Sequence, residues 1–394
     1  MDTSDAIPPA DAREPLSADL HRLRSLTSIK WTMHDREVLP AWVADMDLPP
    51  APVAVEAVER LAARGDFGYN FDAAVKLPAA FAAWQEARHG WRPDPGCLRL
   101  FCDVMQAVQV ALWLTTEPGD GVVIFTPIYP PFLSSVTGTG RRVVDCPLDP
   151  PGWRLDPNRL ADAIDERTRA ILLCSPHNPT GRVFSVEELE AVAEVAARHD
   201  LLVISDEIWG DLTHRDTCFR PFASLGEQAA SRTVTVSAAS KAFNVAGLRC
   251  AVAHIGDGRV SDGLAALPDH LLGAVGSPGA EATLAAWTRG GPWLEATRDH
   301  LTAQRDHLAS RLSDELPEVR FSLPEATYLA WLDFRGLELG EDPARWLLEN
   351  ARVALSAGPD FGAHGRGFAR LNFATSRKIL DEIVDRVVTA LRSR

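Results

Sequence analysis

Short apolar runs separated by helix-like segments constrain the fold of this chain more than any other feature. The runs lie at Gly121–Phe125, Ala170–Cys174, Leu201–Ser205 and Thr233–Val236, and an amphipathic helix is predicted at Val186–His199. Short runs that are apolar throughout are typical of strands buried on both faces. Because strands that alternate with helices form a mostly parallel sheet, the sequence predicts an α/β domain.

Polar residues follow three of these runs. Asn178 lies just beyond the second run, Asp206 ends the third, and Lys241 follows the fourth. Ligands of open parallel sheets bind at the carboxyl ends of the strands. We therefore expect these three side chains to meet at one binding site.

A second unit is predicted after Gly290-Gly291-Pro292, which interrupts the helical pattern. A long helix from Trp293 to about Leu312 follows, then strands at Tyr328–Phe334 and Phe368–Phe373 and a helix at Leu380–Leu391. These elements indicate a smaller α+β domain.

Two domains are also expected from length, since 394 residues exceed the roughly 250–300 at which a single core stops growing. The predicted division has an N-terminal arm at 1–44 that forms part of the small domain. A large domain then spans 45–282, and the small C-terminal domain spans 283–394.

Composition argues against several classes of partner. Lys+Arg 40 against Asp+Glu 54 give a net charge of -14, which disfavours binding to nucleic acids and anionic membranes. The start, Met1–Pro15, has no apolar segment typical of a signal peptide. Histidines and cysteines show no metal-ligand spacing, and no GxGxxG follows a strand. We expect a small-molecule partner, no metal, and no nucleic acid or membrane.

The six cysteines form no CxxC pair and are predicted to be buried thiols in a reducing compartment. A cytoplasmic enzyme is therefore expected.

Lys241, Asp206 and Arg249 together match the needs of pyridoxal 5'-phosphate (PLP). The cofactor requires an amine for its aldehyde, an anion for its ring nitrogen and a cation for its phosphate. Alternatives at single positions are a surface lysine and a helix N-cap aspartate.

Seven motifs extend this observation: Trp42-Val43-Ala44-Asp45-Met46-Asp47, Phe67-Gly68-Tyr69, Thr126-Pro127-Ile128-Tyr129-Pro130-Pro131-Phe132, Ser175-Pro176-His177-Asn178-Pro179-Thr180-Gly181, Ser205-Asp206-Glu207-Ile208, Ser240-Lys241 and Arg370-Leu371-Asn372-Phe373. With them the chain, from about Ile29 onward, resembles fold-type I PLP enzymes of the class I/II aminotransferase family. Within that family it is most similar to the cystathionine β-lyase branch. The resemblance implies a large domain with a mostly parallel sheet flanked by helices, a smaller α+β domain, and a homodimer with its active site at the subunit interface.

Cofactor roles follow from chemistry at these positions. Lys241 is expected to bond the aldehyde and then to act on the Cα proton, and Asp206 to pair with the ring nitrogen. Asn178 can donate to the ring oxygen, although an Asn-Pro turn is an alternative. Tyr129 is expected to stack on the ring or to pack within its loop. His177, next to Asn178, is expected to make a structural hydrogen bond.

Phosphate binding needs several donors. Arg249 offers a charged fork, Val104 and Met105 offer backbone N–H groups at a helix start, and Ser237 and Ser240 offer hydroxyls.

Two other residues, Tyr69 and Asp103, bear on the same phosphate site. By resemblance, Tyr69 reaches it from a second subunit. Asp103 would repel a phosphate, so its side chain is expected to cap the helix or turn away.

Arg370 is the candidate for the α-carboxylate of an amino-acid substrate, because arginine binds carboxylates with two parallel hydrogen bonds. A surface arginine at a strand edge is the alternative. By resemblance, Ala44 lies near the same carboxylate.

The sequence constrains the reaction less than it constrains the cofactor and substrate site. The resemblance implies α,β-elimination from L-cystathionine or another cysteine S-conjugate, which gives a thiol, pyruvate and ammonia. Alternatives are an aminotransferase, a specialised enzyme that decarboxylates or oxidatively deaminates an S-conjugated cysteine, and a regulatory protein that binds PLP.

Trp209 departs from the family pattern, since the β-lyase branch commonly has histidine there and aspartate aminotransferases have tyrosine. Indole donates a hydrogen bond but neither accepts one nor titrates.

Overall fold

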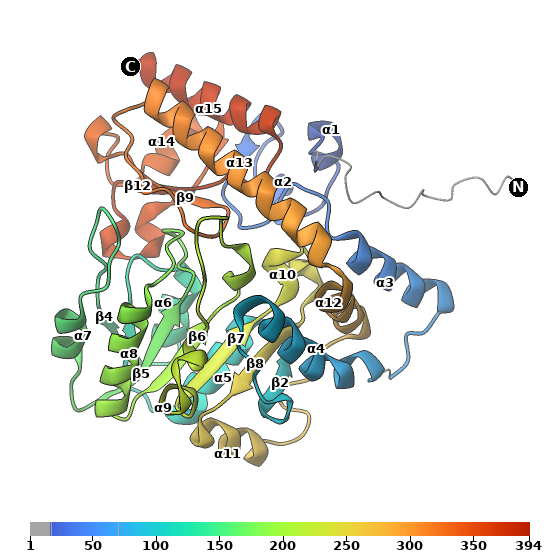
Figure 1. The fold of residues 1–394 in the computed structure, drawn as a ribbon. Helices are drawn as coiled ribbons and strands as arrows, with labels where there is room; N and C mark the ends of the chain where they lie inside the picture. The colour runs from blue at the N-terminus through green and yellow to red at the C-terminus, as the bar shows by residue number, and fades with distance from the viewer. Residues whose placement is uncertain (1–15, 17, 70) are drawn as a thin grey trace, which may run out of the picture.

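The computed structural model describes residues 16, 18–69 and 71–394 (Figure 1). The expectation for Met1–Pro15 lies outside the described residues. The α-helices are α1 (Leu20–Leu23), α2 (Ile29–Thr32), α3 (Pro52–Arg64), α4 (Asp72–His89), α5 (Val104–Thr115), α6 (Pro130–Thr137), α7 (Pro157–Ala163), α8 (Val186–Arg198), α9 (Glu227–Ala230), α10 (Ala239–Ala242), α11 (Gly258–Ala266), α12 (Ser277–Arg289), α13 (Gly291–Glu315), α14 (Pro343–Ala351) and α15 (Arg377–Arg392). The strands are β1 (Leu39–Pro40), β2 (Leu98–Phe101), β3 (Gly121–Ile124), β4 (Arg142–Asp145), β5 (Thr168–Cys174), β6 (Leu202–Asp206), β7 (Thr233–Ser237), β8 (Ala251–Ile255), β9 (Leu329–Asp333), β10 (Val353–Ala354), β11 (Ser356–Ala357) and β12 (Phe368–Asn372).

The large domain is built on a seven-stranded sheet in the order β2-β8-β7-β6-β5-β3-β4. Strands β7, β6, β5, β3 and β4 run parallel, which confirms the predicted α/β sheet. Strands β2 and β8 were not predicted from the sequence. They form one edge of the sheet, where β2 pairs antiparallel with β8 and β8 pairs antiparallel with β7. The register pairs Cys174 with Asp206 and Asp206 with Val236, so the ends of β5, β6 and β7 lie side by side.

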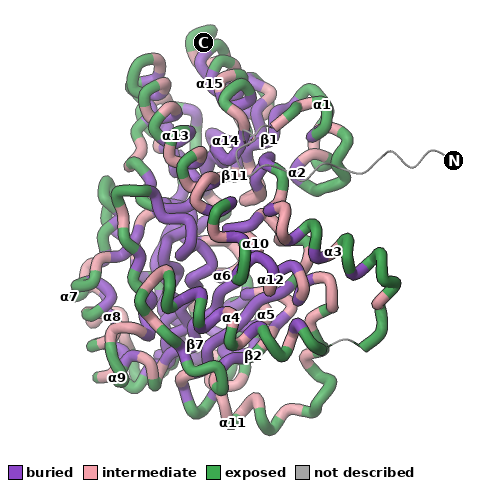
Figure 2. Tube along the Cα trace, turned by 45° about the vertical axis from the view of Figure 1, so that its right-hand side comes forward, coloured by how far each residue is buried: buried purple, intermediate pink, exposed green. Residues whose placement is uncertain are grey.

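Helices cover both faces of this sheet, and alternate strand residues face opposite ways. Ala170 and Leu172 pack in the same cluster as α5, whereas Ile171 and Leu173 pack with α8. Burial of both faces explains why these runs are apolar throughout. Figure 2 shows buried chain at the centre, around β7, and largely exposed chain along α11.

The second sheet is small and antiparallel, in the order β11-β12-β9. Its predicted strands are confirmed within a residue, and the final helix begins at Arg377 rather than at Leu380. The long helix α13 starts at Gly291, next to the predicted interruption. Near the N-terminus, β1 pairs in parallel with β10, which places Leu39 and Pro40 beside this sheet.

All six cysteines are free thiols, but the prediction that they are buried is only partly correct. Cys146, Cys174 and Cys250 are buried, Cys97 and Cys102 are half-buried, and Cys218 is exposed. The buried cysteines lie in or beside strands of the sheet, whereas Cys218 lies in a surface loop. In the described part of the chain, no helix is long and apolar enough to cross a membrane.

Candidate active site

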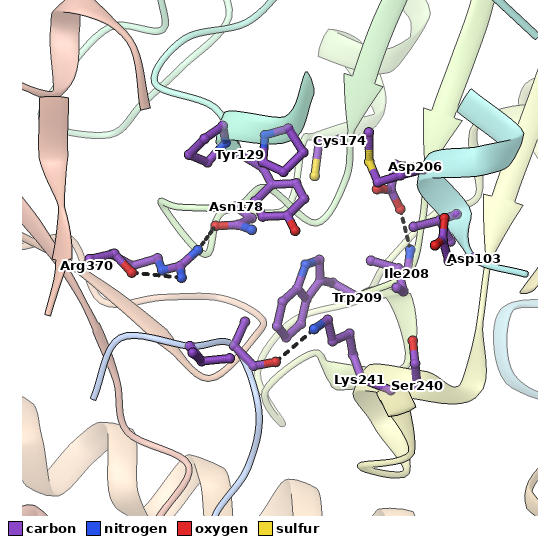
Figure 3. Close-up of a pocket in the computed structure, with 18 of the residues that line it drawn as sticks. Asp103, Tyr129, Cys174, Asn178, Asp206, Ile208, Trp209, Ser240, Lys241 and Arg370 are labelled. Carbon is purple, nitrogen blue, oxygen red and sulfur yellow. Dashed lines mark hydrogen bonds between the residues drawn. The ribbon is translucent and has the colours of Figure 1, made fainter. Parts of the chain in front are cut away.

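A cavity of about 640 Å³ opens at the carboxyl ends of β5, β6 and β7 (Figure 3). Residues of both sheets and of the N-terminal segment line it. Eleven of the predicted site residues lie in its wall: Ala44, Val104, Met105, Tyr129, Asn178, Asp206, Trp209, Ser240, Lys241, Arg249 and Arg370.

Two predicted residues do not line this cavity. Ser237 is the buried last residue of β7, one turn before Lys241. Tyr69 is 99% exposed, in the loop between α3 and α4. Since Tyr69 was expected to reach the site of a second subunit, its contact with phosphate stays a prediction.

Lys241 lies on α10, which follows β7 directly. Its Nζ donates to the carbonyl of Ala44 at 2.8 Å and lies 3.9 Å from Oδ1 of Asp45. Burial lowers the pKa of the Lys241 ammonium, against the opposing effect of Asp45. A lower pKa makes more of the neutral amine available, which is the form that attacks an aldehyde or removes a proton.

Asp206 ends β6 and is buried. One carboxylate oxygen accepts from the N–H of Ile208 at 3.0 Å. Burial raises the pKa of Asp206 to about 7, while that N–H and the charge of Lys241 act in the opposite direction. A buried carboxylate that accepts a single hydrogen bond is stabilised by a cationic partner. A protonated ring nitrogen is such a partner.

Arg370 and Asn178 form a fixed pair. Nη1 of Arg370 donates to Oδ1 of Asn178 at 2.8 Å, and Nη2 donates to the carbonyl of Trp42 at 2.8 Å and to Ser356 at 3.0 Å. Since arginine only donates, the amide oxygen of Asn178 must face it, which leaves the Asn178 NH₂ group to donate elsewhere. Burial lowers the pKa of Arg370 to about 10, so it remains cationic at neutral pH. Its buried Nε has no hydrogen-bond partner among the described residues.

Trp209 forms part of the cavity wall near the lysine. Its ring is fully buried and meets Tyr328 edge-on, with centroids 4.8 Å apart, and Nζ of Lys241 lies 5.8 Å from its centroid. The Tyr328 hydroxyl donates to the carbonyl of Ala44 at 2.8 Å, so Tyr328 and Lys241 share one acceptor. Tyr328 was not predicted as a site residue, because its role depends on a contact 284 residues away in the chain.

The segment from Trp42 to Leu48 is held almost entirely by side chains. Asn372 donates to the carbonyls of Val43 and Asp45 at 2.6 and 2.7 Å. Asn244 donates to the carbonyls of Met46 and Leu48 at 3.1 and 2.7 Å. These contacts connect the segment to β12 of the small sheet and to the loop that follows α10, and they explain why it lies across the cavity.

The start of α5 provides the predicted backbone donors. Val104 and Met105 lie in its first turn, where N–H groups have no partner within the helix. Asp103 is the N-cap and accepts from the N–H of Gln106 at 2.7 Å, which confirms the expected capping. Its other oxygen forms an ion pair with Arg249.

Tyr129 and His177 complete the predicted residues. Tyr129 lines the cavity, and burial raises the pKa of its hydroxyl, so the ring is neutral. His177 is buried, with ring nitrogens 2.9 Å from Oγ1 of Thr180 and 3.3 Å from the carbonyl of Phe125. Burial lowers the pKa of His177 to about 3, which confirms its structural role.

Other residues of the wall were not predicted: Met33, His34, Cys174, Ser356, Asp360 and Phe361. Cys174 had a usable signal, because it ends the apolar run just before Asn178. The others come from loops and short strands with no local pattern.

The residues present fit PLP. The cavity holds an amine, a buried carboxylate that lacks a cation, an amide donor, and a helix start beside an arginine. These are the groups required by the aldehyde, ring nitrogen, ring oxygen and phosphate.

Comparison with known proteins gives the family. The profile described as aminotransferase class I and II matches residues 45–387. A protein from Mycobacterium leprae (strain TN), named provisionally as a cystathionine beta-lyase, is 39% identical over 94% of this chain and 96% of its own. Cystathionine beta-lyase PatB from Bacillus subtilis (strain 168) is 34% identical over 92% of this chain and 96% of its own. The crystal structure of cystalysin from Treponema denticola, which contains a pyridoxal 5'-phosphate cofactor, has a TM-score of 0.89 at 29% identity and covers 94% of this chain and 97% of its own.

A match of this extent establishes the relationship. The chain belongs to the aminotransferase class I and II family, in its cystathionine β-lyase branch.

Proposed function

We propose that this chain is a PLP-dependent carbon–sulfur β-lyase that cleaves L-cystathionine or another cysteine S-conjugate. The products are a thiol, pyruvate and ammonia, and one water molecule is consumed. The observation that carries the proposal is the meeting of Lys241, Asp206, Asn178 and Arg370 in one cavity of a chain from the β-lyase branch.

PLP, when bound, supplies an electron sink for the bond that breaks at Cα. Arg370 lines the cavity and binds the α-carboxylate through its guanidinium, and so orients the amino acid. The Lys241 amine removes the Cα proton, and burial, which lowers its pKa, favours the neutral form that can do so. Asp206 provides the negative charge that keeps the ring nitrogen protonated.

The charges of the cavity favour a lyase over an aminotransferase for dicarboxylic amino acids. Its arginines in the described part of the chain are Arg249 and Arg370. Arg249 is paired with Asp103, and Arg370 is assigned to the α-carboxylate. An aspartate-like substrate would therefore bring a second carboxylate with no arginine to bind it.

A homodimer is part of the proposal. The loop that carries Tyr69 also exposes Phe67 and Phe71, and Val75 follows on α4. Large exposed apolar side chains in one place are typical of an interaction surface. In the proposed dimer this loop covers the partner's cavity and brings the Tyr69 hydroxyl to the phosphate. Six free thiols support a location in the cytoplasm.

The test is to incubate the PLP-loaded protein with L-cystathionine, without any keto acid, and to quantify pyruvate, ammonia and free thiol. Equal release of all three is expected. Conversion of PLP to its amine form without thiol release would contradict the proposal and favour an aminotransferase.

Lys241→Ala is the matched control. It should reduce turnover by at least about 10³-fold, because a positioned acid–base group contributes about 10²–10⁴-fold and the covalent attachment is also lost. PLP should remain bound without the covalent link, which the absorbance spectrum reports.

A further inference from the structure

An ion pair occupies the place where the phosphate is expected. The Arg249 side chain pairs with Asp103, and both residues line the cavity beside the first turn of α5. Arg249, which is expected to bind the phosphate, is thus already paired with the carboxylate of Asp103.

Both oxygens of this carboxylate are engaged. Oδ1 of Asp103 accepts from the N–H of Gln106, and Oδ2 contacts Arg249. The carboxylate is therefore fixed by the helix and by the arginine rather than free to turn into solvent. Arg249 has a backbone φ of 53° between a 3-10 turn (Ala246–Leu248) and β8, and its side chain is 63% exposed, so Asp103 is the contact that holds its guanidinium beside α5.

The pair changes the electrostatics of the site. Arg249 and Asp103 together carry no net charge, so a phosphate gains little attraction from the arginine alone. The neutral donors at the same place are the N–H groups of Val104 and Met105 and the hydroxyl of Ser240. These do not depend on the charge of Arg249.

We propose that Asp103 is an internal counter-ion that neutralises Arg249 and thereby lowers the affinity of the site for the PLP phosphate. The inference rests on the proposed function, because it takes the phosphate of PLP as the ligand. Asp103 acts through Arg249 and is a positioning residue. Its effect is on cofactor affinity rather than on the chemical step.

The experiment is a double-mutant cycle on the full-length protein stripped of PLP. The variants are Asp103→Asn, Arg249→Gln and the double variant. Asparagine caps a helix about as well as aspartate, so the start of α5 should be preserved. PLP affinity is measured by titration, and inorganic phosphate is used as a competitor that probes the phosphate site without bonding to Lys241. Thermal midpoints verify that each variant is folded.

Asp103→Asn should bind both PLP and inorganic phosphate about tenfold more tightly, since it leaves one uncompensated positive charge at the site. Arg249→Gln should bind both more weakly, because it leaves the Asp103 carboxylate unpaired beside the phosphate. The double variant should return to within about threefold of the wild type.

The opposite pattern would overturn the inference. If Asp103→Asn binds phosphate more weakly and the double variant is no better than Arg249→Gln, then Asp103 only orients an arginine that supplies the main charge. Equal affinities of all four proteins would also overturn it, by placing the phosphate elsewhere. Failure of the proposed function is distinguishable, because the L-cystathionine assay reports the reaction, whereas the titrations with PLP and inorganic phosphate report only binding.

Discussion

At the scale of single residues, the site is marked by buried polar groups that have few hydrogen-bond partners in the fold. Asp206 is buried with one hydrogen bond, and Nε of Arg370 is buried with none among the described residues. Glu207, the neighbour of Asp206, is also buried, but Ser205 and the N–H of Phe222 both donate to it. The contrast separates a carboxylate reserved for a ligand from one that serves the structure.

Asp206→Asn should remove a pH-dependent loss of stability from the PLP-free protein. Burial raises the pKa of Asp206 from 3.8 to about 7, so the native state binds more protons than the unfolded state. The free energy of unfolding should therefore fall as pH rises from about 4 to 7. The variant should be more stable than the wild type at pH 8 by an order of 2–4 kcal/mol, and nearly equal at pH 4.

Urea denaturation of both PLP-free proteins at pH 4.5 and pH 8 measures this difference. Glu207 is present in both proteins, and its pKa, which burial raises to about 8, is also raised by the Asp206 charge, so the variant changes the contribution of Glu207 in the same direction. If the free energies of unfolding of the two proteins change equally between pH 4.5 and pH 8, the burial of Asp206 does not lower stability at high pH, which would contradict the prediction.

The central residues could be predicted from the sequence because their chemistry limits the residue type. Lys241, Asp206, Asn178 and Arg370 each lie in a motif, and the structure brings all four to one cavity. Ser237 has the same hydroxyl as Ser240 and lies nearby in sequence, but the end of β7 buries it outside the cavity wall. Such a difference depends on where a strand ends, which composition does not define.

At the scale of elements, the Trp42–Leu48 segment acts as a strap between the two sheets. It has no strand partners of its own, so side chains satisfy its carbonyl groups. Asn372 and Asn244 each donate to two of them, and Asn372 also accepts from the N–H of Ala374 at 2.8 Å. Buried carbonyls without partners are costly, so the strap depends on these amides.

Asn372→Ala should lower the free energy of unfolding by about 2–4 kcal/mol, because the carbonyl of Val43 and the N–H of Ala374 lose their partner, whereas the carbonyl of Asp45 keeps the Lys30 ammonium. The KM for the amino acid should also rise, since the strap carries Ala44. Asn350→Ala is the matched control, because Asn350 donates to one carbonyl at an exposed helix position. Its expected cost is below about 0.5 kcal/mol. Equal costs would contradict the role of the strap.

Elements of the large sheet could be predicted where burial is continuous, as in β5 and β6. The antiparallel edge was missed: only the first and last residues of β2 are buried, and β8 is buried throughout but carries His254 in its apolar run. Strands of two residues, such as β1 and β10, are too short to show any period.

At the scale of the whole molecule, the exposed apolar loop between α3 and α4 is the surface on which the proposed homodimer rests. Phe67→Lys should weaken the proposed dimer, because it places a charge in an apolar surface. Sedimentation should then show monomer at concentrations where the wild type is dimeric, with PLP affinity reduced in parallel. Leu323→Lys is the control, since Leu323 is an exposed leucine far from that loop in sequence. A wild type that is active as a strict monomer would contradict this arrangement.

The contact between Arg370 and the carbonyl of Trp42 joins residues 328 positions apart. Translation must therefore pass β12 before the substrate pocket can close, even though the lysine and its aspartate have long since been made. A nascent chain at that stage would already hold Lys241, Asp206 and Arg249, but not the arginine that is expected to bind the α-carboxylate.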